Sequence, residues 1–178
     1  KNGGDLTKTI RALDASDFII KYNPFGAKKR EEYLKLQDPF CLFYLRFVEG
    51  KDSLSSNFWT NNITSHQIIS WRGLAFENLC FRHIKQIKNT LGISGVETSE
   101  SVWFQKGTED SAGFQIDMLI YRKDNVVNMC EIKFYNDDYE VDNQYMRLLM
   151  RRRNSLEGIL PKRVSIQSTL ITTFGLDR

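Results

Sequence analysis

Acidic and basic residues stand close together in two consecutive strand-like runs. The first run, residues 113–121, contains Asp117, and the second, residues 126–134, contains Glu131 and Lys133. Successive side chains of a strand point to opposite faces, so Glu131 and Lys133 share one face. Two carboxylates beside an ammonium group could hold a hard divalent cation such as Mg²⁺ or Mn²⁺ next to a phosphate. The spacing therefore predicts metal-dependent phosphodiester chemistry, with ordinary surface charge patterning as the alternative.

The turn between the two runs decides whether the carboxylates meet. If residues 123–125 form a three-residue loop, the flanking residues pair and Asp117 lies opposite Glu131 on the same face. An even loop length would separate them. Asn125 tolerates the left-handed backbone that three-residue hairpin loops commonly need, which favours the odd length. Regular alternation along the first run also predicts that Gln115 shares the face of Asp117.

A third carboxylate, Glu77, is predicted on a long helix upstream of the strands. Apolar residues recur at helical spacing from residue 65 to about residue 91, which predicts one continuous helix. Glu77 interrupts this apolar region, so we expect a partly buried carboxylate that needs a cation or a hydrogen-bond donor. Either Glu77 joins the site, where Gln115 could hold it or bind a phosphate, or it forms an ion pair on the surface.

The predicted elements follow one another as helix, three strands, helix and strand. The strands are expected near residues 96–104, 113–121, 126–134 and 164–173, and the second helix at about 142–157. This order, with the strings Trp71-Arg72-Gly73-Leu74-Ala75-Phe76-Glu77, Gln115-Ile116-Asp117 and Cys130-Glu131-Ile132-Lys133-Phe134, resembles the PD-(D/E)XK nuclease superfamily. More narrowly, it resembles the C-terminal domain of bacterial and archaeal AAA-type ATPases. One departure is that Phe114 and Gln115, rather than a proline, precede the Ile116-Asp117 pair.

The resemblance implies an α/β fold with a restriction-endonuclease-like mixed sheet flanked by helices. It implies that Asp117 and Glu131 bind Mg²⁺ or Mn²⁺, that Lys133 orients and activates water, and that Glu77 assists, with Gln115 as a further catalytic candidate. It also implies DNA or RNA as a partner and an ATPase domain N-terminal to this segment in the same protein. A catalytically silent module that binds nucleic acid or docks a partner is the alternative. A homo-oligomer is left open.

Basic residues gather on the helix predicted at about 142–157. Arg147 and Arg151 are four residues apart, so they share a face that could follow a phosphate backbone. Arg152 falls in the stripe predicted to face the sheet, and we expect it to project toward the acidic cluster. All three are assigned as nucleic-acid contacts, although charge runs on helices are often only solvated faces.

The first 50 residues resemble the last part of a winged helix. A helix at residues 6–15 precedes two strand-like runs, from residue 17 and over residues 30–36, that are joined by turn residues. The predicted nucleic-acid contacts are Lys8 and Arg11 on the helix and Lys28 and Lys29 on the wing. Residues 1–50, which end in an aromatic helix near residues 40–47, are assigned to this partial winged-helix module. Residues 51–64 are assigned to a linker and residues 65–178 to the nuclease-like domain.

Composition is consistent with an intracellular protein. The net charge of +3 and the pI near 8.7 permit nucleic-acid binding without requiring it. Three cysteines without metal-ligand spacing indicate free thiols, and only two histidines argue against a zinc site. No long apolar stretch or signal peptide is visible, so we expect a cytoplasmic protein without a membrane span. Because the sequence starts at Lys1 rather than methionine, we expect it to be part of a longer protein.

Overall fold

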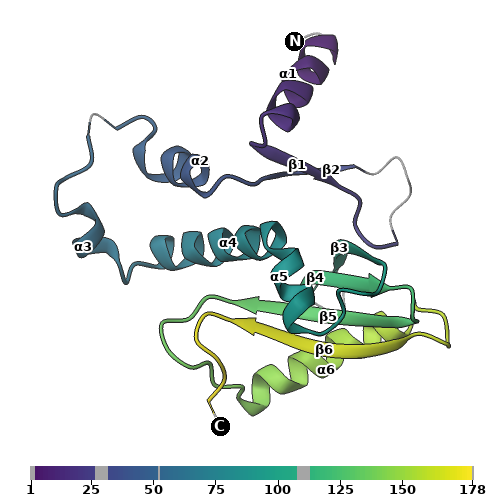
Figure 1. Ribbon diagram of the computed structural model, residues 1–178. Helices are drawn as coiled ribbons and strands as arrows, with labels where there is room; N and C mark the ends of the chain where they lie inside the picture. Colours follow the sequence, from purple (N-terminus) through teal and green to yellow (C-terminus); the bar gives the residue numbers. More distant parts are fainter. Residues whose placement is uncertain (1–2, 27–31, 52, 108–112, 178) are drawn as a thin grey trace. The chain divides into compact units, whose positions relative to one another are not determined.

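The computed structural model describes residues 3–26, 32–51, 53–107 and 113–177. By compactness the chain divides into two units. The N-terminal unit consists of residues 1–22 and 32–82, and the sheet unit consists of residues 23–31 and 83–178. The division between residues 82 and 83 differs from the linker predicted at residues 51–64. Figure 1 shows the elements of both units in chain order.

The sheet unit is built on a four-stranded mixed sheet with the order β3-β4-β5-β6. The strands are β3 Thr98–Gln105, β4 Phe114–Arg122, β5 Val126–Lys133 and β6 Ser165–Thr172. The first three pair antiparallel through short connections, whereas β6 runs parallel to β5. A parallel pair needs a long crossover, and helix α6 Asn143–Glu157 lies within that connection. The expected mixed sheet flanked by helices is confirmed.

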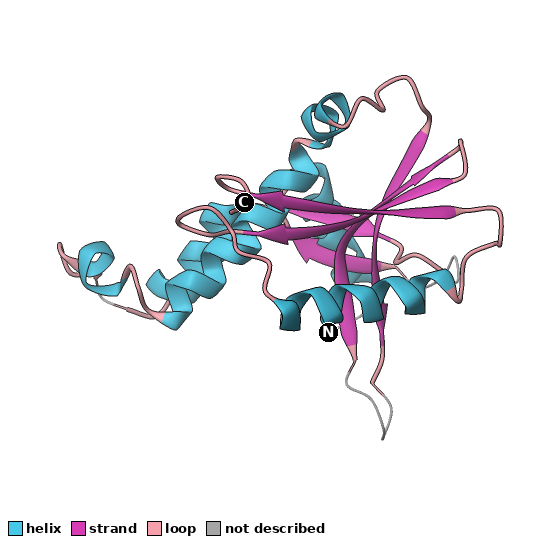
Figure 2. Cartoon of the chain, turned by 90° about the horizontal axis from the view of Figure 1, so that it is seen from below, coloured by secondary structure: helices cyan, strands magenta, loops and turns pink. Residues whose placement is uncertain are grey.

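Helices cover both faces of this sheet (Figures 1 and 2). On one face, Lys88 of α5 Ile84–Thr90 forms an ion pair with Glu100 of β3, with 3.1 Å between Nζ and Oε1. On the other face lies α6, which begins where the Asp142 carboxylate accepts a hydrogen bond from the Tyr145 amide at 2.6 Å. This N-cap satisfies one of the free amides at the start of the helix and matches the predicted beginning.

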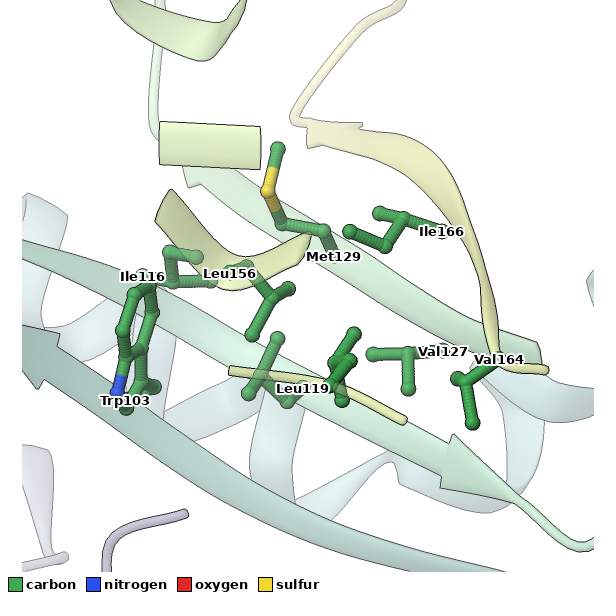
Figure 3. Packing of buried hydrophobic residues seen from close by; sticks show 9 residues of the cluster. Trp103, Ile116, Leu119, Val127, Met129, Leu156, Val164 and Ile166 are labelled. Carbon is green, nitrogen blue, oxygen red and sulfur yellow. The ribbon is translucent and has the colours of Figure 1, made fainter. Parts of the chain in front are cut away.

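The core of the sheet unit lies between the sheet and α6 (Figure 3). Its buried members come from β3, β4, β5, α6, β6 and the segment between α6 and β6, and they are Trp103, Ile116, Leu119, Val127, Met129, Leu156, Leu160, Val164 and Ile166. Burial of each large aliphatic side chain stabilises the fold by about 1.5–3 kcal/mol. The core thus holds α6 against the strands that carry the predicted site.

A β-bulge interrupts the alternation predicted for β4. Ser101 of β3 pairs with Leu119, but Trp103 pairs with Ile116, so β4 contains one extra residue at Asp117 and Met118. Ile116 and Leu119 consequently belong to the same core cluster, although regular alternation would have placed them on opposite faces. The prediction of regular alternation along β4 is therefore wrong at Asp117 and Met118. That Gln115 shares the face of Asp117 stays a prediction. Gln115 is exposed.

The N-terminal unit begins with a helix and a β-hairpin, as the sequence predicted. These are α1 Gly3–Ala15 and the antiparallel strands β1 Ile19–Tyr22 and β2 Tyr33–Leu36. Lys8 and Arg11 are exposed on α1, which buries none of its residues. Lys28 and Lys29, predicted on the wing, lie outside the described residues. The hairpin is followed by α2 Pro39–Phe43, a π-helical turn at Tyr44–Val48, α3 Phe58–Asn62 and α4 His66–Arg82.

An aromatic cluster forms the centre of the N-terminal unit. Each ring lies within 6.5 Å of at least two others, centroid to centroid, and the rings belong to Phe43, Phe47, Phe58, Trp59 and Trp71. The segment predicted as a linker therefore contributes α3 and two packed rings. In the aromatic segment at residues 40–47, Phe47 is buried, whereas Phe40 and Tyr44 are exposed.

The helix predicted from residue 65 to about residue 91 is two helices, so the prediction of one continuous helix is wrong. α4 ends at Arg82, His83 has φ −107° and ψ 26°, and α5 begins at Ile84. Helix α4 belongs to the N-terminal unit and α5 to the sheet unit. The apolar residues of each helix pack within its own unit, so the helical spacing of apolar residues continues past the break although the helix does not. Among the described residues, no helix is both long enough and apolar enough to cross a membrane.

The three cysteines are free thiols, as expected. Cys80 and Cys130 are buried and Cys41 is partly exposed. Cys130 directly precedes Glu131 in β5. Because neighbouring side chains of a strand alternate, Cys130 points to the opposite face of β5 from Glu131.

Candidate active site

The hairpin between β4 and β5 has the predicted three-residue loop. β4 ends at Arg122 and β5 begins at Val126, and Asn125 adopts the left-handed conformation with φ 63°. The register pairs Tyr121 with Val127 and Met118 with Cys130, and Asp117 and Glu131 are the next residues beyond the last pair. The predicted hairpin register is confirmed as far as this pair. The charge of Asp117 acts on the Glu131 carboxyl, so the two carboxylates lie near each other within the sheet unit.

Asp117 is fixed by the backbone of the neighbouring strand. Its Oδ2 accepts a hydrogen bond of 2.9 Å from the amide of Ile132. The last pair in the register of β4 and β5 is Met118 with Cys130, and the bulge begins there. The Asp117 carboxylate therefore binds an amide of β5 that lies beyond this last pair. The bulge therefore aims the Asp117 side chain along β5, toward Glu131.

Glu131 is one of the most buried polar residues of the described chain, with 1% of its surface exposed. Its Oε2 forms an ion pair with Nη1 of Arg152 and accepts a hydrogen bond of 3.4 Å from the hydroxyl of Tyr145. Within the described residues its Oε1 is buried without a hydrogen-bond partner. Burial, followed by the nearby charge of Asp117, raises the pKa of the Glu131 carboxyl, and Arg152 and Lys133 oppose this effect.

A mostly apolar cavity adds to the desolvation of Glu131. The cavity has a volume of about 170 Å³, and its lining includes Met129, Leu149 and Glu131. A carboxylate beside such a cavity lacks the water that would stabilise its charge. The buried carboxylate therefore depends on Arg152 or on another cation.

Lys133 and Tyr145 border the carboxylate pair. The Lys133 ammonium lies 5.4 Å from the centroid of the Tyr145 ring, a cation–π distance. Burial and the Glu131 charge raise the pKa of the Tyr145 hydroxyl far above its usual range, so it stays protonated and donates to Glu131. Tyr145 thus connects the two charged residues of β5 to helix α6.

Arg152 lies on the side of α6 that faces the sheet, as its position in the helical stripe predicted. Its guanidinium also stacks near the ring of Phe114, at 5.9 Å from the centroid. A contact from Arg152 to nucleic acid stays a prediction, and it would require the ion pair with Glu131 to open. Arg147 and Arg151 are exposed and border one groove, so they do share a face.

Glu77 belongs to the N-terminal unit, apart from the unit that carries Asp117 and Glu131. Its Oε2 forms an ion pair of 3.3 Å with Nζ of Lys35 from β2, and both side chains are about one-fifth exposed. The predicted need for a cation is thus met by a lysine distant in sequence. The assisting role of Glu77, like the catalytic role of Gln115, stays a prediction.

Sequence reasoning missed the partner of the buried carboxylate and the tyrosines beside it. Arg152 had been assigned to nucleic acid because charge runs suggest phosphate contacts. The signal that could have indicated its partner is the arginine within an otherwise apolar stripe, since a buried guanidinium needs a carboxylate. Tyr139 and Tyr145 flank the start of α6 and were not assigned to the site.

The oxygen ligands that Asp117 and Glu131 offer are of the kind that a divalent cation prefers, although they are few. Among the described residues no three His, Cys, Asp or Glu side chains are grouped so that they could hold a metal ion. Two carboxylates do converge, and the buried Oε1 of Glu131 is an acceptor that a cation would satisfy. The carbonyl of Ile132, the residue after Glu131, is a candidate third ligand. The arrangement can thus hold a hard cation if Arg152 shares or releases Glu131.

Comparison with known proteins assigns no relative to this chain. No family model matches the sequence, and no significant match is found among curated proteins. The functional assignment therefore rests on the geometry of Asp117, Glu131 and Lys133 and on the residues around them.

Proposed function

We propose that this chain is a nuclease-like domain with a restriction-endonuclease-like fold that cleaves phosphodiester bonds of DNA or RNA with the help of Mg²⁺ or Mn²⁺. The observation that carries the proposal is that the Asp117 carboxylate binds the amide of Ile132, next to Glu131, close enough for its charge to raise the pKa of the Glu131 carboxyl. Lys133 lies two residues after Glu131 on the same face. The proposal includes an ATPase domain in the same full-length protein, which would control the cleavage.

Asp117, Glu131 and the Ile132 carbonyl would hold the metal ion. A bound divalent cation would lower the pKa of a coordinated water and stabilise the charge that develops on the phosphate oxygens. Asp117 is positioned for this role because the Ile132 amide holds one of its oxygens. The Tyr145 hydroxyl holds Oε2 of Glu131 in the same way.

Lys133 supplies a fixed positive charge at the edge of the acidic pair. A compact ammonium group stabilises the phosphate oxygens in the transition state more than in the ground state if it is already in place. The ring of Tyr145 keeps the Lys133 stem on the site side of β5. Arg152 contributes a second cation close to the same carboxylate.

A second candidate is a catalytically silent domain that binds nucleic acid. The ion pair between Glu131 and Arg152 favours it, because a guanidinium already neutralises the carboxylate that a metal ion would need. In this case Arg147 and Arg151 would bind phosphates without cleavage. Docking of a protein partner through the aromatic segment at residues 40–47 stays a prediction.

A plasmid-nicking assay with Mg²⁺ or Mn²⁺ separates the two candidates. We expect Lys133→Ala and Glu131→Gln to lower the nicking rate by about 100-fold or more, in the range typical of losing one preorganised electrostatic group. Lys123→Ala is the matched control, since Lys123 is exposed in the hairpin loop. Equal nicking by wild type and Lys133→Ala would identify a contaminating nuclease. Calorimetric titration with Mn²⁺ supplies a second readout, and nucleic-acid binding without metal binding or nicking would support the silent domain.

A further inference from the structure

A groove with aromatic and basic walls runs beside the first half of α6. Its volume is about 600 Å³, and its lining includes Tyr139, Asp142, Tyr145, Arg147 and Arg151. This volume falls within the range of about 300–1,000 Å³ that small-molecule sites occupy. The groove lies entirely within the sheet unit, and its residues have no role in the chemistry proposed above except for Tyr145.

Three tyrosines form a continuous row along this part of the molecule. The ring centroids of Tyr135 and Tyr139 are 5.6 Å apart and those of Tyr139 and Tyr145 are 5.7 Å apart, with the rings nearly perpendicular in each pair. Tyr135 is half exposed, and Tyr139 borders the groove. Aromatic rings held in this way offer surfaces on which nucleobases stack, with little dependence on base identity.

The position of Tyr139 does not depend on its side chain. Its amide donates a hydrogen bond of 3.0 Å to the carbonyl of Gly175, and its carbonyl accepts one of 3.2 Å from the amide of Asp177. These bonds tie the segment before α6 to the C-terminal segment. Replacement of the ring should therefore leave the backbone of the groove in place.

Charge is unevenly distributed along the groove. Asp142 caps the start of α6, whereas Arg151 lies nine residues later, about 13 Å along the helix axis. Arg147 and Arg151 are one turn apart, with about 5–6 Å between their Cβ atoms. A phosphate is therefore attracted to the arginine end and repelled at the Asp142 end, where the tyrosine rings offer room for an uncharged group.

The groove adjoins the acidic pair. Tyr145 lines the groove, and the same side chain donates to Glu131 and contacts Lys133. A chain bound along the groove would consequently lie beside the residues of the proposed cleavage site.

We infer that the groove binds single-stranded nucleic acid, with an unpaired base stacked on Tyr139 and neighbouring phosphates on Arg147 and Arg151. The inference rests on the proposed function and narrows its substrate class. In a duplex both faces of each base are covered by its neighbours, so a ring such as Tyr139 can stack only on a base that is unpaired. The row of tyrosines thus selects single strands, whereas the arginines alone would bind any phosphate backbone.

Fluorescence anisotropy with three probes of equal length in EDTA tests this inference. The probes are a labelled oligothymidylate, an abasic oligonucleotide with the same number of phosphates, and a duplex. We expect the oligothymidylate to bind best and Tyr139→Ala to weaken its binding by roughly tenfold, in line with the loss of one stacked base. Tyr139→Phe should bind like wild type, and binding of the abasic probe should not change in either variant.

Two further variants separate stacking from charge and from packing. Tyr139→Leu fills space without an aromatic ring and should weaken binding like Tyr139→Ala. Arg147→Ala with Arg151→Ala should weaken all three probes, whereas Arg153→Ala, an exposed arginine of α6 outside the groove lining, is the control. Equal affinity for oligothymidylate and abasic probe, unchanged in Tyr139→Ala, would overturn the inference and leave the proposed cleavage intact. Base-dependent binding of the labelled oligothymidylate without its cleavage in Mg²⁺ or Mn²⁺ would instead remove the cleavage and keep the groove.

Discussion

Glu131 of β5 and Arg152 of α6 form a buried ion pair, and each keeps one buried polar atom without a partner among the described residues. The two atoms are Oε1 of the carboxylate and Nε of the guanidinium. A bound cation and the guanidinium would therefore compete for the same carboxylate. Substitutions of this pair can therefore show whether Glu131 serves the stability of the sheet unit, the binding of a cation, or both.

Loss of one partner of this pair should destabilise the protein strongly. The side chains of Glu131 and Arg152 are 2% and 15% exposed, so Arg152→Ala leaves a buried carboxylate without its cation. We expect this to lower the free energy of unfolding by about 3–5 kcal/mol, as measured by urea denaturation. The apolar pair Glu131→Leu with Arg152→Met should be close to wild type or more stable. A single Arg152→Ala variant as stable as wild type would show that the pair is not buried in solution.

The stability contributed by Glu131 should fall as the pH rises. Burial raises the pKa of this carboxyl above its ordinary value of 4.5. Between these two values the folded protein keeps a proton that the unfolded chain has already released, so the free energy of unfolding decreases with rising pH. Glu131→Gln lacks this proton equilibrium. As the pH rises above this ordinary value of 4.5, we therefore expect wild type to lose stability relative to Glu131→Gln, in urea titrations without divalent cations. A wild type that gains stability relative to the variant over this range would contradict the raised pKa.

Two substitutions of Asp117 should distinguish its role in folding from its role in metal binding. Asp117→Ala removes the acceptor of the buried Ile132 amide and should cost about 1–3 kcal/mol of unfolding free energy. Asp117→Asn retains an acceptor oxygen, so its stability should remain near that of wild type. Both variants should lose Mn²⁺ affinity in calorimetric titrations if Asp117 is a ligand. Full Mn²⁺ affinity in Asp117→Asn would show that Asp117 is not a metal ligand and that its side chain only stabilises the bulge.

The hairpin loop should tolerate glycine but not a β-branched residue at position 125. Asn125 has φ 63°, and its carbonyl accepts a hydrogen bond of 2.9 Å from the amide of Ser165. Asn125→Gly should be nearly neutral in thermal unfolding. Asn125→Val should cost about 1–2 kcal/mol or more, because the left-handed region is unfavourable for such side chains. A Val variant with the thermal midpoint of the Gly variant would show that the loop adopts another conformation.

The sequence by itself determined the strands of the sheet unit, the start of α6 and the register of the central hairpin. These features depend on local chemistry: an apolar run for each strand, Asp142 as a cap, and Asn125 in a loop of odd length. The parity of a strand and the length of a loop are countable in the sequence. For this reason Glu131 and Lys133 could be assigned to one face of β5, and Asp117 to the neighbouring part of β4, from the sequence.

Only the tertiary structure decided how this site is completed. The bulge at Asp117 and Met118 arises from pairing with β3, so no local pattern could show that the alternation along β4 is interrupted there. The partner of Glu131 comes from α6, 21 residues along the chain, and Lys35, the partner of Glu77, is 42 residues away from it. Ion pairs between distant residues depend on which surfaces pack together, and packing is a property of the whole fold rather than of a local segment.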